Sequence, residues 1–231
     1  MGKGVLLRWI ENKRLGSHLR GRGVEIGALW RRFPVAASST VWYIDRHHSS
    51  ELQREYPELK RQPVSPDVLA DAGQLPFGDG SLDFVIASHI LEHLPFPLAC
   101  LRSWYRVLGA GGVLILKIPD MRYTFDANRR RSTLRHLVEE HLHPEEFDKR
   151  AHFQDWVEHV EGRPPGSEAL RHETNRLMDL DYSIHYHVWT DEDIRELIDY
   201  TRTAMGLHWR PVLFLRAHFY RKECAVALRR E

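Results

Sequence analysis

Two carboxylates near the start of the chain stand where they could hold a small ligand. Glu25 lies in a short apolar run that leads to Gly27, and Asp45 ends the next apolar run. A glycine at the end of a strand lets a ligand approach the backbone closely. An acidic residue at the tip of the neighbouring strand can accept hydrogen bonds from a ribose diol. Two carboxylates suit a neutral or cationic cofactor, and a plain turn with a solvated aspartate is the alternative.

Histidine is the second residue type that could do chemistry, because the chain has 15 and eight of them fall between His136 and His187. Imidazole can transfer a proton near neutral pH or bind a metal ion. His185 and His187 share one face if their segment is extended, and we expect both in an acceptor site, one of them as a general base. Buried structural histidines are one alternative and a metal-ligand pair is another. No cysteine or carboxylate spacing completes a metal set, so the sequence predicts no metal site.

Short apolar runs alternate with amphipathic segments and predict the elements that position these residues. Strands are expected at 24–27, 40–44, 66–70, 83–88 and 112–118, and helices at 4–15, after Ser49 or Ser50 as N-cap, and at 94–108. This alternation predicts an α/β sheet of mostly parallel strands joined by right-handed crossovers. Ligands of such sheets bind outside the carboxyl ends of the strands.

The alternation stops after Pro119. Residues 120–189 are rich in His, Arg and Glu, and we expect them to form an inserted helical cap over a substrate region within a single domain of residues 1–231. A capping box at 190–193 begins another helix. Strands around 209–219 and 223–228 would close the sheet with an antiparallel hairpin.

Three further motifs follow the glycine turn in order: DAGQLPF (71–77), LEHL (91–94) and RVLGAGG (106–112). Over residues 20–120 the set resembles class I S-adenosylmethionine (SAM)-dependent methyltransferases of the methyltransferase-11 type. The resemblance implies a Rossmann-like sheet, SAM as cofactor and S-adenosylhomocysteine as product. The first motif departs from the family pattern, because Leu29 replaces the second glycine of G-x-G in the variant E-I-G-A-L.

The resemblance also implies roles for individual residues. The cofactor contacts would be Glu25, Gly27, Ala28 and Leu29 at the methionine part, Asp45 and Arg46 at the ribose, Asp71, Ala72 and Gly73 at the adenine, and Ser88 and His89 near the sulfonium. Glu92 and His93 would fix the helix that follows them.

The acceptor would lie where the sheet meets the cap. His89 joins His185 and His187 as a candidate catalytic residue, and Tyr123, Asp126 and Arg129 are candidate acceptor contacts. The arginine run at 129–135 could bind a phosphate or carboxylate on the acceptor. The alternative for this run is a solvated start of a helix.

Charge and hydropathy limit the class of function. The formal net charge of +1 disfavours a nucleic-acid binder, and the absence of any apolar run of about 18 residues argues against a membrane span. Two distant cysteines fit a reducing, cytoplasmic setting. We expect a SAM-dependent methyltransferase acting on an oxygen of a small-molecule or sugar/glycan acceptor. A methyltransferase acting on a macromolecule and a degenerate methyltransferase-fold binding module are the alternatives, and the oligomeric state is left open.

Overall fold

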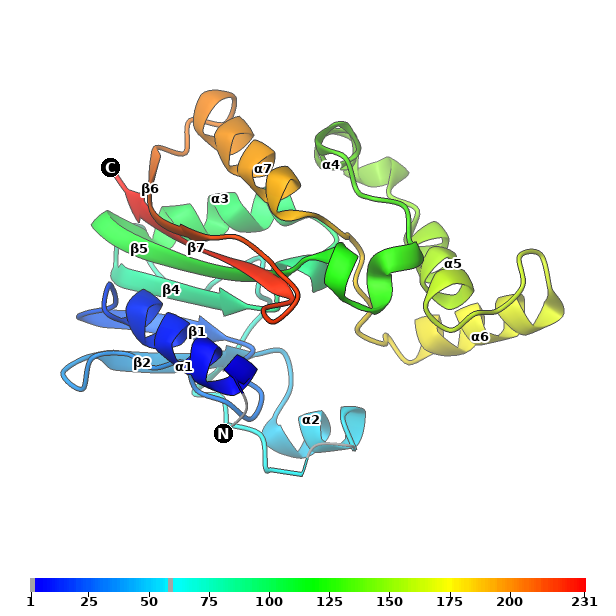
Figure 1. Ribbon diagram of the computed structural model, residues 1–231, viewed down its shortest axis with the longest axis horizontal. Helices are drawn as coiled ribbons and strands as arrows, with labels where there is room; N and C mark the ends of the chain where they lie inside the picture. Colours follow the sequence, from blue (N-terminus) through cyan, green and yellow to red (C-terminus); the bar gives the residue numbers. More distant parts are fainter. Residues whose placement is uncertain (1–2, 58–59) are drawn as a thin grey trace.

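The computed structural model describes residues 3–57 and 60–231, and its strands form one mixed sheet (Figure 1). The strands are β1 (Arg22–Ile26), β2 (Thr40–Asp45), β3 (Val68–Leu69), β4 (Leu82–Ser88), β5 (Leu108–Pro119), β6 (Trp209–Leu215) and β7 (Glu223–Arg230). Their order across the sheet is β3-β2-β1-β4-β5-β7-β6. Strands β1 to β5 pair in parallel, and β7 is antiparallel to both β5 and β6. The predicted α/β sheet with a C-terminal antiparallel hairpin is confirmed.

The central strands are buried because their side chains are apolar on both faces. In β5, residues 113–119 are all buried, as expected for a strand covered by helices on both sides. It begins at Leu108, earlier than predicted, because Leu82 pairs with Leu108 before a register shift. The edge strand β3 has two residues, fewer than predicted, since its only partner within the described residues is the end of β2.

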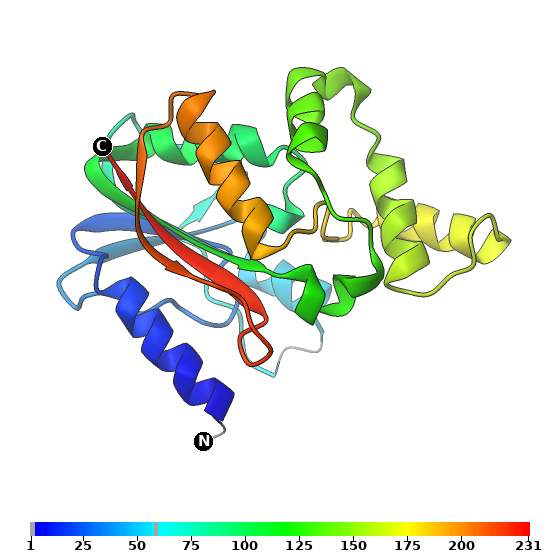
Figure 2. The ribbon, with the colours of Figure 1, turned by 45° about the horizontal axis from the view of Figure 1, so that its top comes forward.

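Helices cover the two faces of the sheet. The helices α3 (Pro97–Val107) and α7 (Asp191–Thr203) lie on one face, and α1 (Lys3–Gly16) lies on the other (Figures 1 and 2). In α3 the buried side chains recur at helical spacing and join the core above β1, β4 and β5. On the opposite face, Leu15 and Leu19 pack with Phe84 and Ile86.

Two helix starts test the predicted caps. The capping box of α7 is confirmed, because the Thr190 N–H donates to Asp193 and the Asp193 N–H donates to the Thr190 hydroxyl. The helix α2 (Ser49–Glu55) begins one or two residues earlier than predicted. Its N-cap is His48, not Ser49 or Ser50, because Glu51 is the third helical residue and accepts the His48 N–H at 3.0 Å.

Residues 120–189 form a helical region beyond the carboxyl edge of the sheet (Figure 1). Its helices are α4 (Leu134–Leu142), α5 (Lys149–His159) and α6 (Glu168–Asp179), with short 3₁₀ turns at η2 (Met121–Tyr123), η3 (Phe125–Asn128) and η4 (Pro144–Glu146). Helix α6 was not predicted, although Ser167 is an N-cap signal for it. The region has its own apolar cluster of Phe153, Trp156, Val157, Leu170, Leu177 and Ile184. No helix in the described part of the chain combines the length and apolar composition that crossing a bilayer requires.

Trp104 joins the core of α3 to the loop after β3. It is fully buried, and its Nε1 donates to the Ala72 carbonyl at 2.7 Å. We expect Trp104→Phe to lower the free energy of unfolding by about 2–4 kcal/mol, because it leaves a small cavity and an unpartnered carbonyl. Chemical denaturation measures this loss. Trp9→Phe is the matched control, since Trp9 is 49% exposed, and equal stability of the two variants would contradict the prediction.

Candidate functional site

The carboxyl ends of β1, β2 and β4 border a cavity of about 680 Å³. The chain reverses its direction across the sheet between β1 and β4, which is where open α/β sheets bind ligands. The volume of the cavity falls within the range of about 300–1,000 Å³ that is usual for small-molecule sites. Most of the expected cofactor residues line it, namely Glu25, Gly27, Ala28, Leu29, Asp45, Arg46, Asp71, Ala72, Ser88 and His89.

The loop after β1 keeps a left-handed backbone at two positions. Gly27 has φ +61°, where a side chain would strain the backbone, and an added Cβ would lie 2.3 Å from the end of the Ile90 side chain, which would have to shift. Leu29 has φ +48°, a conformation that glycine adopts at no steric cost. Leu29 therefore takes, with some strain, the kind of backbone conformation that the second glycine of G-x-G would adopt freely.

Glu25 of β1 connects the start of this loop to the backbone of Phe33. It is 3% exposed, and both of its carboxylate oxygens accept the Phe33 N–H at 3.0 Å. Burial raises the pKa of Glu25 to about 7, against the opposing effects of the Phe33 hydrogen bond and the Arg32 charge. The carboxyl group is thus partly protonated at neutral pH, and a cation bound beside it would favour the ionised form.

Two aspartates mark the neighbouring strand ends. Asp45 is the last residue of β2, and burial raises the pKa of its carboxyl group although the Arg46 N–H donates to it at 2.8 Å. Asp71 accepts the Gly73 N–H at 2.6 Å, which closes a tight turn. Gly73 itself does not line the cavity. Its place is behind Asp71, where an added Cβ would meet that carboxylate and Cys100.

His89 follows β4 with φ +58° and lies between two carboxylates. Its Nε2 is 2.6 Å from Glu223 Oε2, and its Nδ1 is 3.4 Å from Glu92 Oε1. Burial lowers the pKa of His89, but the hydrogen bond to Glu223 and the nearby Glu92 carboxylate outweigh this effect and raise the pKa to about 9. The two carboxylates therefore favour the protonated ring, which disfavours a general-base role for this candidate catalytic residue.

Lys117 and Glu223 were missed by the sequence reasoning. The Lys117 ammonium lies 2.6 Å from Glu223 Oε1 and donates to Asn12 of α1 at 3.2 Å. The sequence signal for Lys117 was its position as a single lysine within the apolar run 112–118. No sequence signal pointed to Glu223, because only the antiparallel pairing of β7 with β5 brings it to this edge.

The helical region supplies the opposite wall of the cavity through Phe147, Lys149, Asp181, Ser183 and Tyr186. Lys149 forms an ion pair with Asp181 at 2.7 Å, and Arg46 approaches the same carboxylate at 3.4 Å. These contacts join the wall to the end of β2. No sequence motif identified this wall, since its residues are close only after the helices pack.

The expected acceptor residues lie outside the cavity lining. Asp126, Arg129 and His185 are 1%, 5% and 8% exposed. Asp126 forms an ion pair with Arg129 at 3.1 Å and lies 2.8 Å from His185 Nδ1. Tyr123 packs beside the Arg122 guanidinium instead. These charged groups pair with one another inside the helical region, so the structure makes them internal supports.

His187 is also outside the cavity and is fully buried. Burial lowers its pKa to about 3. The LEHL motif contacts the same segment, because the Tyr186 N–H donates to the Glu92 carbonyl at 2.7 Å and His93 Nδ1 lies 2.9 Å from the Ile184 carbonyl. His185 and His187 therefore do not line the cavity, and the His185 ring packs against His93, which does, with ring centroids 4.7 Å apart.

Removal of the Glu223 charge should lower the pKa of His89. In Glu223→Gln, the strongest ion pair of the imidazolium is lost, so we expect the pKa to fall from about 9 toward its ordinary value of 6.5. An NMR titration of the His89 ring resonances measures this change. Glu145→Gln, at an exposed site, is the control, and an unaltered His89 titration in Glu223→Gln would refute the prediction.

Comparisons with known proteins agree with this geometry. A model described as a methyltransferase domain matches residues 21–116, and no curated protein matches the sequence. The N-methyltransferase NodS from Bradyrhizobium japonicum WM9, solved with S-adenosyl-l-homocysteine, has a TM-score of 0.51 and 12% identity over 99% of this chain and 88% of that chain. A putative Zn-dependent alcohol dehydrogenase from Rhodobacter sphaeroides has a TM-score of 0.56 and 12% identity over 96% of this chain and 89% of that chain. Both are similar to this chain in fold.

Proposed function

We propose that this chain, whose residues 21–116 match a model described as a methyltransferase domain, is a SAM-dependent methyltransferase that transfers a methyl group from SAM to an oxygen of a small-molecule or sugar acceptor. The observation that carries the proposal is the cavity at the β1–β4 switch point, whose lining contains ten of the eleven residues expected to contact the cofactor. SAM is the cofactor, and when bound it supplies a methyl group activated by a sulfonium.

The charges and backbone of the cavity fit that cofactor. SAM carries a cationic sulfonium and an ammonium group, and buried Glu25 is a carboxylate that gains from a nearby cation. Gly27 lines the cavity and has no side chain, so a ligand can approach its backbone closely. In this proposal Glu25 holds the methionine part, Asp45 accepts from the ribose hydroxyls, and Asp71 with Ala72 holds the adenine.

The acceptor side of the cavity is proposed to lie at His89 and Lys117. Methyl transfer depends mainly on aligning the acceptor and excluding water. The carboxylates of Glu223 and Glu92 favour the protonated ring of His89, so in this proposal its positive charge attracts an ionised acceptor oxygen and the ring does not remove a proton. An acceptor oxygen that ionises readily, such as a carboxylate or an acidic hydroxyl, suits a site whose histidine is a cation.

Asp45→Asn tests the cofactor assignment. The amide cannot accept two charge-assisted hydrogen bonds, so we expect affinity for S-adenosylhomocysteine to fall about 10- to 100-fold. Isothermal titration calorimetry measures the affinity. Asp199→Asn is the matched control, because Asp199 is exposed and pairs with Arg202 away from the cavity. Absence of binding by the unaltered protein would overturn the proposed function itself.

Glu25 should make cofactor binding depend on pH. Its pKa of about 7 means that the carboxylate fraction rises between pH 6 and pH 8, so affinity for S-adenosylhomocysteine should rise over that range. In Glu25→Gln we expect weaker binding with a flat pH profile. The stability of the variant is the control. Because folding raises the pKa of Glu25, ionisation of this carboxyl group costs stability as the pH rises from 4.5 to about 7. The glutamine variant should therefore unfold no more easily than the unaltered protein at pH 8. A pH-independent affinity in the unaltered protein would count against Glu25.

A further inference from the structure

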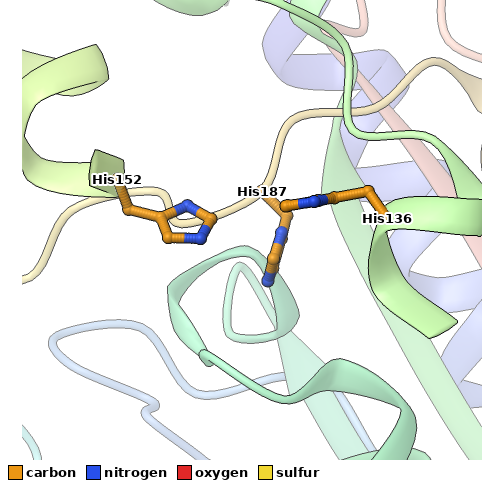
Figure 3. Close-up of side chains that lie close together, drawn as sticks. All are labelled: His136, His152 and His187. Carbon is orange, nitrogen blue, oxygen red and sulfur yellow. The ribbon is translucent and has the colours of Figure 1, made fainter. Parts of the chain in front are cut away.

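Three histidines and one glutamate from distant parts of the chain meet behind the cavity wall. This histidine cluster consists of His136 and Glu140 from α4, His152 from α5, and His187 from the segment before α7. Figure 3 shows its three histidines. One ligand atom from each of the three imidazoles lies within 4.8 Å of the others. The cluster falls outside residues 21–116, so the methyltransferase domain does not account for it.

The three Nε2 atoms converge on one carboxylate. His152 Nε2 lies 2.8 Å and His136 Nε2 3.2 Å from Glu140 Oε1, and His187 Nε2 lies 3.6 Å from Glu140 Oε2. His152 also has the Tyr186 carbonyl 3.0 Å from its Nδ1. A neutral imidazole donates from one nitrogen only, so His152 faces one acceptor more than it can satisfy. The contact between Nδ1 and a carbonyl is the one that fixes ligating histidines around metals.

Two polar atoms of the cluster are left without hydrogen bonds. His187 Nδ1 and Glu140 Oε2 are both buried and have no hydrogen-bond partner among the residues that the structure describes, and the His187 side chain has no exposed surface. Buried polar groups without partners are uncommon in folded proteins and call for a compensating interaction. The surplus acceptor at His152 and the unpartnered Glu140 oxygen both indicate a missing positive charge at this place.

We propose that the histidine cluster binds one divalent transition-metal ion of the zinc class, with His136, His152 and His187 as ligands and Glu140 as the fourth. Imidazole nitrogen suits Zn²⁺, Cu²⁺ and Ni²⁺, and three imidazoles with one carboxylate match a closed tetrahedral zinc site. Such a set leaves no open position, which makes the ion structural.

A metal here would brace the cavity wall. His187 Nε2 lies 3.2 Å from the Pro95 carbonyl, which leaves its unpartnered Nδ1 as the ligand atom, and the His152 ring stacks on Phe147 with centroids 5.1 Å apart. Pro95 and Phe147 both line the cavity. The ion would thus hold α4, α5 and the segment before α7 together at the back of the acceptor side.

Metal titration of the chelator-treated protein tests the proposal without cofactor or acceptor. We expect Zn²⁺ to bind one-to-one by calorimetry and Co²⁺ to give the visible d–d absorption of a tetrahedral site. His136→Ala and His152→Ala should each weaken binding by at least about 10-fold. A His143→Ala, Glu145→Gln variant is the control, because it removes an exposed group of possible ligands on the neighbouring turn and should bind like the unaltered protein.

Three results would overturn the proposal. They are the absence of stoichiometric binding, full binding in His152→Ala, and loss of binding in His185→Ala alone, which would place the metal at the group of Glu92, His93 and His185. If a cluster variant does not fold by circular dichroism, the NMR spectrum of the Co²⁺-loaded unaltered protein decides. Paramagnetically shifted ring N–H signals from three histidines are expected, and their absence excludes the site.

Discussion

The position of the site depends on one topological constraint, the reversal of strand order between β1 and β4. The chain leaves β1 toward β2 and β3 and returns across the sheet to β4, so the loops after β1 and β4 diverge. The diverging loops leave a hollow at the carboxyl edge of the sheet. Gly27, Asp45 and His89 follow or end strands at that edge, and they line the same cavity for this reason.

Charged side chains can be buried at this edge of the sheet only because they form ion pairs with one another. Lys117 is 5% and Glu223 7% exposed, and they form an ion pair next to protonated His89. Leaving one partner of such a group uncompensated in the interior is costly. The antiparallel strand β7 is therefore part of the site as well as part of the sheet, because it delivers the carboxylate that Lys117 and His89 share.

The charged residues of the helical region mainly pair with other residues of the same region. Arg129 bonds to Asp126, Asp155 and the His185 carbonyl while staying 5% exposed. His152 and His185 of this region likewise face carboxylates or backbone carbonyls in its interior. What the region gives to the cavity is a wall built from Phe147, Lys149 and Tyr186, held in place from behind.

The sequence by itself determined the sheet and the cofactor edge, because both depend on local signals. Apolar runs set the strands, and a glycine turn or an acidic residue at a strand end has its meaning within a few residues. Only the tertiary structure decided the rest. Glu223 reaches His89 across the β5–β7 pairing, and His185 lies against Asp126 and not in the cavity, since burial and long-range partners select the role of a charged side chain. The spacing of the histidines along the chain does not reveal those partners. The cluster of His136, His152 and His187 therefore forms only when α4 and α5 pack.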